Sequence, residues 1–170
     1  EYVTTVFSDA KHLKENICSL QPAALQFSFG ATLSIGEYVM PRILSRLLAR
    51  FPEMKISMPV ANTQVLLERL KCGELDFILV EGLIDKSEYD TTLFSLERFV
   101  PVCSPHSKFA RREVEFQAIT GSRLILREKG SGTREILENI LEEKNYSLHA
   151  FEKIIEIGNM AAIKQLVSDD

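Results

Sequence analysis

The stretch LILREKGSGTREILENI, residues 124–140, contains three successive patterns. An apolar run is followed by a loop of small and hydroxylated residues, and then by apolar residues at helical spacing, which predicts a strand, a loop and a helix. A helix N-terminus has unpaired backbone N–H groups, and its dipole favours negative charge. The loop KGSGTR, residues 129–134, therefore has three possible uses: it holds a phosphate for chemistry, it binds a small anion in a sensor, or it only turns the chain.

The same alternation of strands and helices occurs through the rest of the chain. Strands are expected at residues 25–29, 55–60 and 75–80, with helices between them. Pro41 lies inside the first helical span, so we expect a first turn at 35–39 and a more regular helix from Pro41 onward. Asn62 and Thr63 are expected to cap the second helix.

A second α/β set follows the charged segment near residues 81–90. Its expected elements are a strand at 123–126, a helix at 133–144, a strand at 151–157 and a helix at 160–167. The sequence therefore predicts an α/β fold with two Rossmann-like lobes and a ligand cleft between them, at the carboxyl ends of the strands.

The first twenty residues have a different pattern. Apolar residues are spaced alternately by three and four positions, at Val3, Val6, Ala10, Leu13, Ile17 and Leu20. This spacing predicts a helix. The helix either lies on its own domain or is a linker helix that pairs with a second copy. It ends at Gln21, because a residue before proline is disfavoured in the α region.

Composition excludes several classes of protein. The chain has 170 residues, of which 45% are hydrophobic and 26% charged, as in ordinary globular proteins. A net charge of −4 predicts no general nucleic-acid surface. The sequence has no apolar run of about 20 residues for a membrane span and no signal-peptide pattern at its start. Three scattered cysteines argue for a reducing cytoplasm. Three distant histidines predict no metal site, and we expect no cofactor.

Catalytic motifs are missing from the sequence. It has no Gly-x-Ser-x-Gly, His-Glu-x-x-His or phosphate-loop pattern, and KGSGTR lacks a lysine after its second glycine. What remains are hydroxyls at two strand-to-helix junctions: Thr32 and Ser34, then Ser131 and Thr133. Such hydroxyls either cap the helices or, together with the helix N-termini, bind an anion. We expect no acidic side chain nearby that would repel one.

Four ordered stretches together resemble the effector-binding region of LysR-type transcriptional regulators. They are LQFSFGATLSIGEYVMPRILSRLLARFPEMKI, NTQVLLERLKCGELDFILVEG, LILREKGSGTRE and IEIGNMAAIKQLVSDD, within residues 25–170. The resemblance implies two lobes like those of type 2 periplasmic solute-binding proteins, preceded by a dimerising linker helix. It also implies a homodimer or tetramer, which contacts DNA only through an N-terminal helix-turn-helix domain absent from this chain.

The resemblance further implies a division of the chain and a set of effector contacts. Residues 1–22 would form the linker helix, 23–82 lobe I, 83–91 the hinge and 92–170 lobe II, with the C-terminal return to lobe I absent. The residues implied to line the cleft are Thr32, Ser34, Ile35, Asn62, Thr63, Ser131, Gly132, Thr133 and Asn159.

Our interpretation is the effector-sensing region of a cytoplasmic LysR-type regulator. It is not an enzyme, it uses no cofactor or metal, and it binds a small anionic effector such as a carboxylate metabolite. One alternative is a free-standing solute-binding protein of similar fold, against which the missing signal peptide counts. A second is a transferase that uses KGSGTR for an anionic substrate, against which the lack of a nearby acid or base counts.

Overall fold

The structure is a computed structural model that describes residues 2–7, 26–82 and 84–169, with side chains from residue 26 onward. The chain divides into two compact units, Glu1–Glu97 and Arg98–Asp170. This boundary lies later than the lobe boundary expected at residue 92. The reason is that strand β5, Thr91–Leu96, pairs within the first unit.

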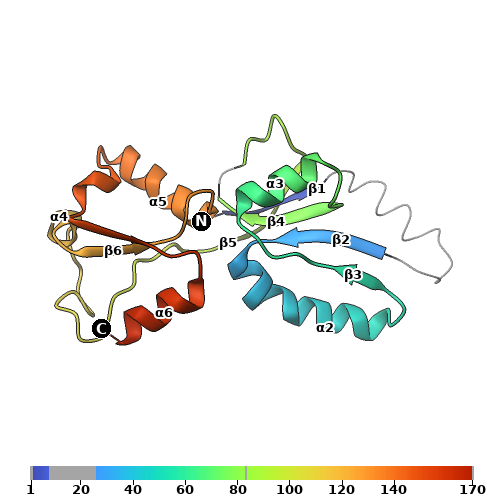
Figure 1. Ribbon diagram of the computed structural model, residues 1–170, viewed down its shortest axis with the longest axis horizontal. Coiled ribbons are helices and arrows are strands. Elements are labelled where there is room, and N and C mark those ends of the chain that lie inside the picture. Colours follow the sequence, from blue (N-terminus) through green and yellow to red (C-terminus); the bar gives the residue numbers. More distant parts are fainter. Residues whose placement is uncertain (1, 8–25, 83, 170) are drawn as a thin grey trace. The chain divides into compact units, whose positions relative to one another are not determined.

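The first unit has a five-stranded sheet in the described residues, in the order β3-β2-β4-β1-β5. Strands β2 (Gln26–Ala31), β3 (Lys55–Ser57) and β4 (Phe77–Glu81) are parallel. The connecting helices, α2 (Met40–Arg50) and α3 (Thr63–Lys71), lie on opposite faces of these strands (Figure 1). Strand, helix, strand, helix and strand thus follow one another as predicted, and the doubly wound α/β architecture is confirmed.

The two faces of β4 belong to different apolar clusters. Leu79 packs on the side of α2, in the cluster that also contains Phe29, Ala31, Ile35 and Met40. Ile78 and Val80 point to the other side and pack with Leu66, Leu70 and Leu75. Burial on both faces explains why this strand is apolar almost throughout.

Glycine at position 30 allows α3 to approach the sheet closely. A Cβ added to Gly30 would lie 2.4 Å from Cδ2 of the fully buried Leu66.

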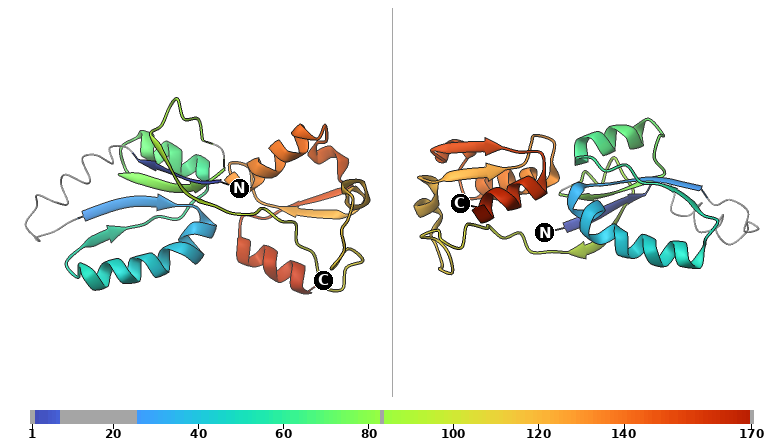
Figure 2. Two further views of the ribbon diagram at one scale, coloured as in Figure 1. Left: turned by 180° about the vertical axis from the view of Figure 1, so that it is seen from behind. Right: turned by 60° about the horizontal axis from the view of Figure 1, so that its bottom comes forward.

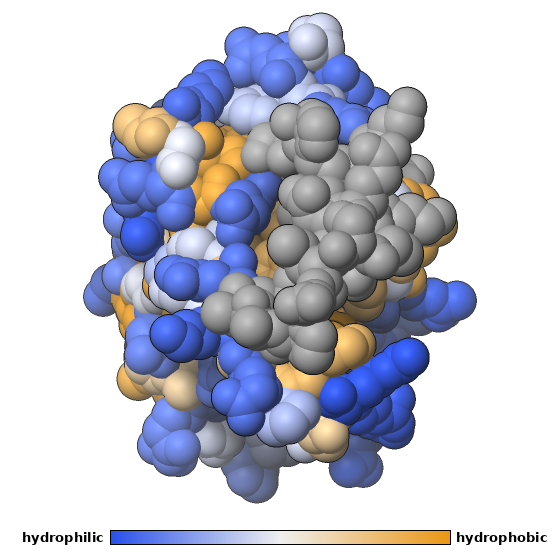
Figure 3. All heavy atoms as spheres, turned by 90° about the vertical axis from the view of Figure 1, so that its right-hand side faces the viewer, coloured by the Kyte–Doolittle hydropathy of each residue, from blue (hydrophilic) through white to orange (hydrophobic). Residues whose placement is uncertain are grey.

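Elsewhere on this unit, large apolar side chains remain partly exposed, and the surface seen in Figure 3 has hydrophobic groups among mostly hydrophilic ones.

The helix after β2 changes its hydrogen-bonding pattern before Pro41. Residues Ile35–Val39 form a π-helical turn, in which the N–H of Met40 bonds to the carbonyl of Ile35, and α2 continues from there. Proline has no N–H to donate, so an irregular turn before it is expected. The first turn expected at 35–39, with a more regular helix after it, is confirmed.

The strand expected at 55–60 is shorter than predicted. Strand β3 ends at Ser57, and only an isolated bridge joins Ala31 to Val60. Pro59 lies between them and lacks the N–H that a continuous ladder requires.

The helix predicted from Val3 is wrong at its first residues. Tyr2–Phe7 form strand β1, which pairs antiparallel with both β4 and β5. All six residues are β-branched or aromatic, and these types favour strands. The rest of the predicted helix lies in residues 8–25, outside the described part of the chain. The dimerising linker therefore stays a prediction.

The second unit is built on the parallel pair β6 (Arg123–Leu126) and β7 (Lys153–Glu156). Helices α5 (Gly132–Glu143) and α6 (Met160–Asp169) follow these strands and lie on opposite sides of the pair (Figure 2). All four elements were predicted within a few residues. Two short helices were not: α4, Phe116–Thr120, and a 3₁₀ turn at Leu148–Ala150.

Candidate functional site

In the first unit, two helices begin side by side at the carboxyl ends of β2 and β3. The bridge between Ala31 and Val60 holds the ends of the two segments together. A Cβ added to Gly36 would lie 2.8 Å from Cγ2 of Val60, so only glycine allows the first helix to start this close to the second segment. This geometry places Thr32 and Asn62 at neighbouring strand ends, where α/β folds commonly bind ligands.

Thr32 is the most distinctive of the predicted site residues. It is 5% exposed, its N–H donates to the carbonyl of Leu79 at 3.0 Å, and its carbonyl accepts from the N–H of Gly36 at 2.7 Å. Its hydroxyl Oγ1 is buried and, alone among the buried side-chain polar atoms of the described residues, makes no hydrogen bond. An unsatisfied buried hydroxyl has an energetic cost, so its retention at a helix start suggests a partner from outside the chain.

Ser34 and Ile35 follow Thr32 but differ from each other in environment. Ser34 is half-buried and makes no capping hydrogen bond, whereas Ile35 is 3% exposed and packs in the apolar cluster. Both residues line a hollow of about 230 Å³ within this unit, together with apolar side chains that include Tyr38 and Phe94 and with two acidic residues, Glu81 and Glu97. The first unit therefore places a hydroxyl beside a mainly apolar surface that also includes two carboxylates.

Asn62 and Thr63 have structural roles at the start of α3. The side-chain oxygen of Asn62 accepts from the N–H of Val65 at 3.0 Å, and the Thr63 hydroxyl donates to the carbonyl of Glu81 at 3.4 Å. The predicted cap is confirmed. A contact from Asn62 to an anionic effector would have to come from its amide nitrogen, because only the N–H groups of that side chain donate.

In the second unit, α5 and α6 likewise begin at the carboxyl ends of two paired strands. Ser131 is the N-cap of α5: it is 4% exposed, and its carbonyl accepts from the N–H of Glu135 at 3.0 Å, but its side chain makes no capping bond. Gly132 is buried and Thr133 half-buried. Gly130 has φ of +83°, which a side chain would disfavour, and it turns the chain into the helix.

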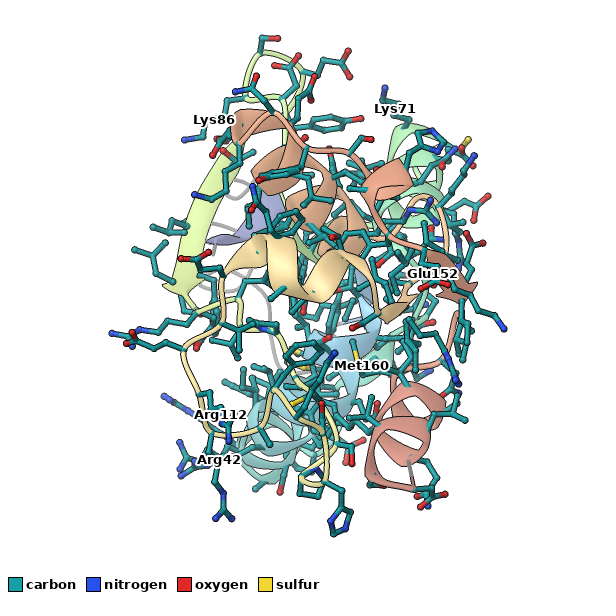
Figure 4. All side chains as sticks on the ribbon, turned by 90° about the vertical axis from the view of Figure 1, so that its left-hand side faces the viewer. Arg42, Lys71, Lys86, Arg112, Glu152 and Met160 are labelled. Carbon is teal, nitrogen blue, oxygen red and sulfur yellow. The ribbon has the colours of Figure 1, made fainter. Side chains whose placement is uncertain are left out.

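Asn159 corresponds in position to Asn62. Its side-chain oxygen accepts from the N–H of Ala162 at 3.0 Å and so caps α6. In Figure 4, Met160 marks the start of α6, and Glu152 marks the opposite end of β7. Each unit thus has an asparagine that caps one helix and, at the start of the other helix, a buried residue whose hydroxyl makes no cap: Thr32 in the first unit and Ser131 in the second.

Acidic side chains lie beside both junctions, contrary to our expectation: Glu81 and Glu97 line the hollow of the first unit, and Glu128 begins the loop between β6 and α5 in the second. A Cβ added to Gly158 would be 3.5 Å from Oε2 of Glu128. That carboxylate is held by the buried Arg127, whose Nε and Nη2 each donate to it at 2.8 Å. The pair is formally neutral, so Glu128 repels an anion less than an unpaired carboxylate would.

Arg134 is buried rather than solvated. It is 8% exposed and pairs with Glu138 at 2.8 Å and Glu156 at 2.5 Å. Burial alone would lower the pKa of Arg134, but its hydrogen bonds to the two carboxylates outweigh this and raise it. The i, i+4 spacing from Arg134 to Glu138 is visible in the sequence, whereas the contact with Glu156 depends on the pairing of β6 with β7.

The structure brings the predicted residues together in two groups, one in each unit. The first contains Thr32, Ser34, Ile35, Asn62 and Thr63, and the second contains Ser131, Gly132, Thr133 and Asn159. Among the described residues, no group of three or more His, Cys, Asp or Glu side chains is placed to hold a metal ion. None of the helices in the described part is long and apolar enough to cross a membrane.

Comparisons with known proteins agree on one family. The model of the LysR substrate binding domain matches residues 21–170. The regulator YeiE of Escherichia coli K12 is 31% identical over 137 residues, which is 81% of this chain and 46% of that protein. CysL of Bacillus subtilis is 30% identical over 118 residues, which is 68% of this chain and 39% of that protein. Both are described as HTH-type transcriptional regulators, and the chain spans less than half of their length.

Solved structures show the same fold. The regulatory domain of CcmR from Synechocystis, in complex with 2-PG, has a TM-score of 0.65 at 20% identity and covers 84% of this chain and 67% of its own. The effector binding domain of QuiR, in complex with shikimate, has a TM-score of 0.67 at 16% identity and covers 87% and 71%.

The type 2 periplasmic-binding-protein-like fold class is therefore confirmed. On the strength of the matched residues, this chain belongs to the LysR substrate-binding domain family.

Proposed function

We propose that this chain is the effector-sensing region of a cytoplasmic LysR-type transcriptional regulator and that its effector is a small anion. The whole protein would contact DNA through a helix-turn-helix domain. The proposed effector contacts are the hydroxyls and N–H groups of both junctions, at Thr32 and Ser34 in the first unit and at residues 131–133 in the second. The region performs no catalysis in this proposal.

The buried hydroxyl of Thr32 carries the proposal. It stands at the start of a helix, where the dipole favours negative charge, and no described residue accepts or donates a bond to it. Ser131 stands at the equivalent place in the second unit, buried and with no capping bond from its side chain. Hydroxyls and helix N–H groups together form charge-assisted hydrogen bonds with a carboxylate or phosphate.

The relatives support an anionic effector. The CcmR domain was solved with 2-PG and the QuiR domain with shikimate, which is a carboxylate. The apolar side chains beside Ser34, such as Tyr38 and Phe94, favour an effector with an apolar part next to its charged group.

We also propose that the regulator acts as a homodimer or tetramer. Helix α2 exposes Ile43 and Leu48 at 37% and 42%, and Tyr38 just before it is 53% exposed. A second copy that covers this face would remove apolar surface from water. Light scattering at high micromolar concentration tests this, and a monomer would contradict it.

The experiment for the effector is an NMR titration of the isotope-labelled chain with a panel of small carboxylates and phosphates. Shikimate and its neutral methyl ester form a matched pair in that panel. We expect at least one anion to shift the amide resonances of residues 32–34 and 131–133 in a saturable way, and its neutral analogue to shift them much less. If no member of the panel shifts either junction, or if the neutral analogues bind equally well, the proposal of an anionic effector is wrong.

A further inference from the structure

Arg134 joins three segments of the second unit. Its Nε donates to Glu138, one turn along α5, at 2.8 Å. Its Nη1 donates to the carbonyl of Arg127, just after β6, at 3.2 Å, and to Oε2 of Glu156, at the end of β7, at 2.5 Å. A single planar guanidinium therefore holds the start of α5 against the ends of both strands.

Those three segments lead directly into the candidate binding residues of this unit. Arg127 is followed by the loop to Ser131, and Glu156 is followed by the loop to Asn159. The backbone reinforces the link at the same place, because the N–H of Ile157 donates to the carbonyl of Leu126 at 2.9 Å. The orientation of the N–H groups at both helix starts thus depends on groups that Arg134 holds.

Arg134 is poorly suited to attract an anion itself. The guanidinium is 8% exposed and already bonded to two carboxylates, so the group of Arg134, Glu138 and Glu156 has a formal charge of −1. The positive charge of Arg134 is neutralised within the unit by these two carboxylates. Any contribution of Arg134 to binding therefore comes from the positions in which it holds other groups.

We propose that Arg134 is a positioning residue: without touching the effector, it fixes the loops at 128–132 and 157–160 in one arrangement, so that both helix N-termini present their donors together. That an effector binds here rests on the proposed function. The link between the two loops exists in the chain without ligand and is tested separately.

The experiment compares backbone hydrogen exchange in the wild-type chain, Arg134→Met, Arg134→Lys and the control Arg123→Met. Arg123 is an exposed arginine at the other end of β6. We expect Arg134→Met to speed exchange in both loops by about tenfold or more relative to residues 124–126 of β6, with Arg134→Lys intermediate and Arg123→Met unchanged. Normalising to β6 separates loosening of the loops from a general loss of stability.

Two further variants identify which bond of Arg134 holds the loop at 157–160. Glu156→Gln weakens the bond from Arg134 to the end of β7, so we expect faster exchange in the loop at 157–160. Glu138→Gln weakens a bond within α5 and should leave exchange in that loop unchanged. If Arg134→Met exchanges like the wild type in both loops, or loosens only the loop at 128–132, the proposed link is overturned. Equal acceleration of β6 would also overturn it, because the role would then be general stability.

Binding is measured on the same proteins with inorganic phosphate as the probe, by NMR shifts of residues 131–133. We expect Arg134→Met to bind phosphate about tenfold to a hundredfold more weakly, the range typical when a group that orients ligands is removed. Unchanged affinity in this variant would overturn the positioning role. If neither phosphate nor any other anion of the panel shifts these residues in the wild-type chain, the proposed function is contradicted instead, and the exchange data still decide whether Arg134 links the loops.

Discussion

Each of the two strand-to-helix junctions places a buried hydroxyl at the start of a helix, but different interactions hold the hydroxyl in place. In the first unit, Thr32 is placed by apolar packing: Ile35 and Leu79 are buried around it, and Gly36 allows close contact with Val60. In the second unit, Ser131 is placed by charge, because Arg127 and Arg134 are both buried and ion-paired.

This difference has a physical consequence. An apolar junction is specified by shape and responds to changes of volume, whereas an ion-paired junction responds to removal of a single partner. The hydroxyls that the two junctions share, on Thr32 and Ser131, are therefore supported by independent means. Each junction can be weakened in a way that leaves the other intact.

The largest effect on stability is expected from Ile35→Ala. Ile35 is 3% exposed within the apolar cluster of the first unit. Truncation removes buried apolar surface and leaves a cavity, and together these should lower the free energy of unfolding by about 2–5 kcal/mol. The control is Val65→Ala on α3, where the side chain is 40% exposed and the expected change is within about 0.5 kcal/mol. Urea unfolding followed by circular dichroism measures both. Similar costs at the two positions would show that the first junction does not depend on packing.

Arg127→Met is the counterpart in the second unit. It leaves the carboxylate of Glu128 without its buried partner and should cost about 2 kcal/mol, less than for a fully buried pair because Glu128 keeps some exposure. The matched control is Arg69→Met, which breaks the exposed pair with Glu74 and should cost about 0.2–1 kcal/mol. If the two substitutions cost the same in urea unfolding, charge does not hold the second junction.

The two asparagine caps give an intermediate effect. Asn62→Ala and Asn159→Ala should each lower the free energy of unfolding by about 1 kcal/mol. The two losses should be similar, because each side chain accepts one hydrogen bond of 3.0 Å. Replacement by aspartate should preserve the cap. Ser131→Ala should cost less than either, since the Ser131 side chain makes no capping bond. Thermal unfolding of these five variants checks the order, and a larger loss for Ser131→Ala would show a structural use of its hydroxyl.

The smallest effect is the pH dependence of Glu135→Gln. Desolvation of the carboxylate by neighbouring groups, together with the nearby charge of Glu138, raises the pKa of Glu135. The folded chain therefore disfavours the ionised form, a cost that is absent below the ordinary pKa and grows as pH rises through the raised one. The variant should be slightly more stable than wild type at about pH 7, and the gain should shrink toward about pH 4. Thermal unfolding of both chains across this pH range measures the trend, and a gain that persists at acid pH would contradict the assignment.

Much of this fold can be predicted from the sequence, because apolar periodicity and the positions of proline and glycine are local signals. The break before Pro41, the Asn62 cap and the order of strand and helix in both units are all of this kind. The first residues of the expected N-terminal helix were mispredicted. Their apolar spacing of three and four positions coincides with a run of strand-forming residues, Tyr2–Phe7, whose pairing with β4 and β5 is a long-range contact.

The candidate site could be predicted as a set of residues but not in its division of roles. Sequence alone does not show that Asn62 and Asn159 use their oxygens as caps while the Thr32 hydroxyl has no partner. Nor does it show that Arg134 is buried, because its partner Glu156 lies 22 residues away. These features depend on which strand ends lie next to each other.

The central claim is that the buried Thr32 hydroxyl serves the effector rather than the fold, and Thr32→Val tests it most directly. Valine keeps the shape and removes an unsatisfied polar atom, so unfolding of the apo chain should be as difficult as in wild type or more so.

Calorimetric titration with an anion that binds the wild type should then show a loss of about 1.5–3 kcal/mol, roughly tenfold to a hundredfold in affinity. Maintained stability with weakened binding is the result that this account predicts. A less stable apo chain that binds the anion with unchanged affinity would contradict it.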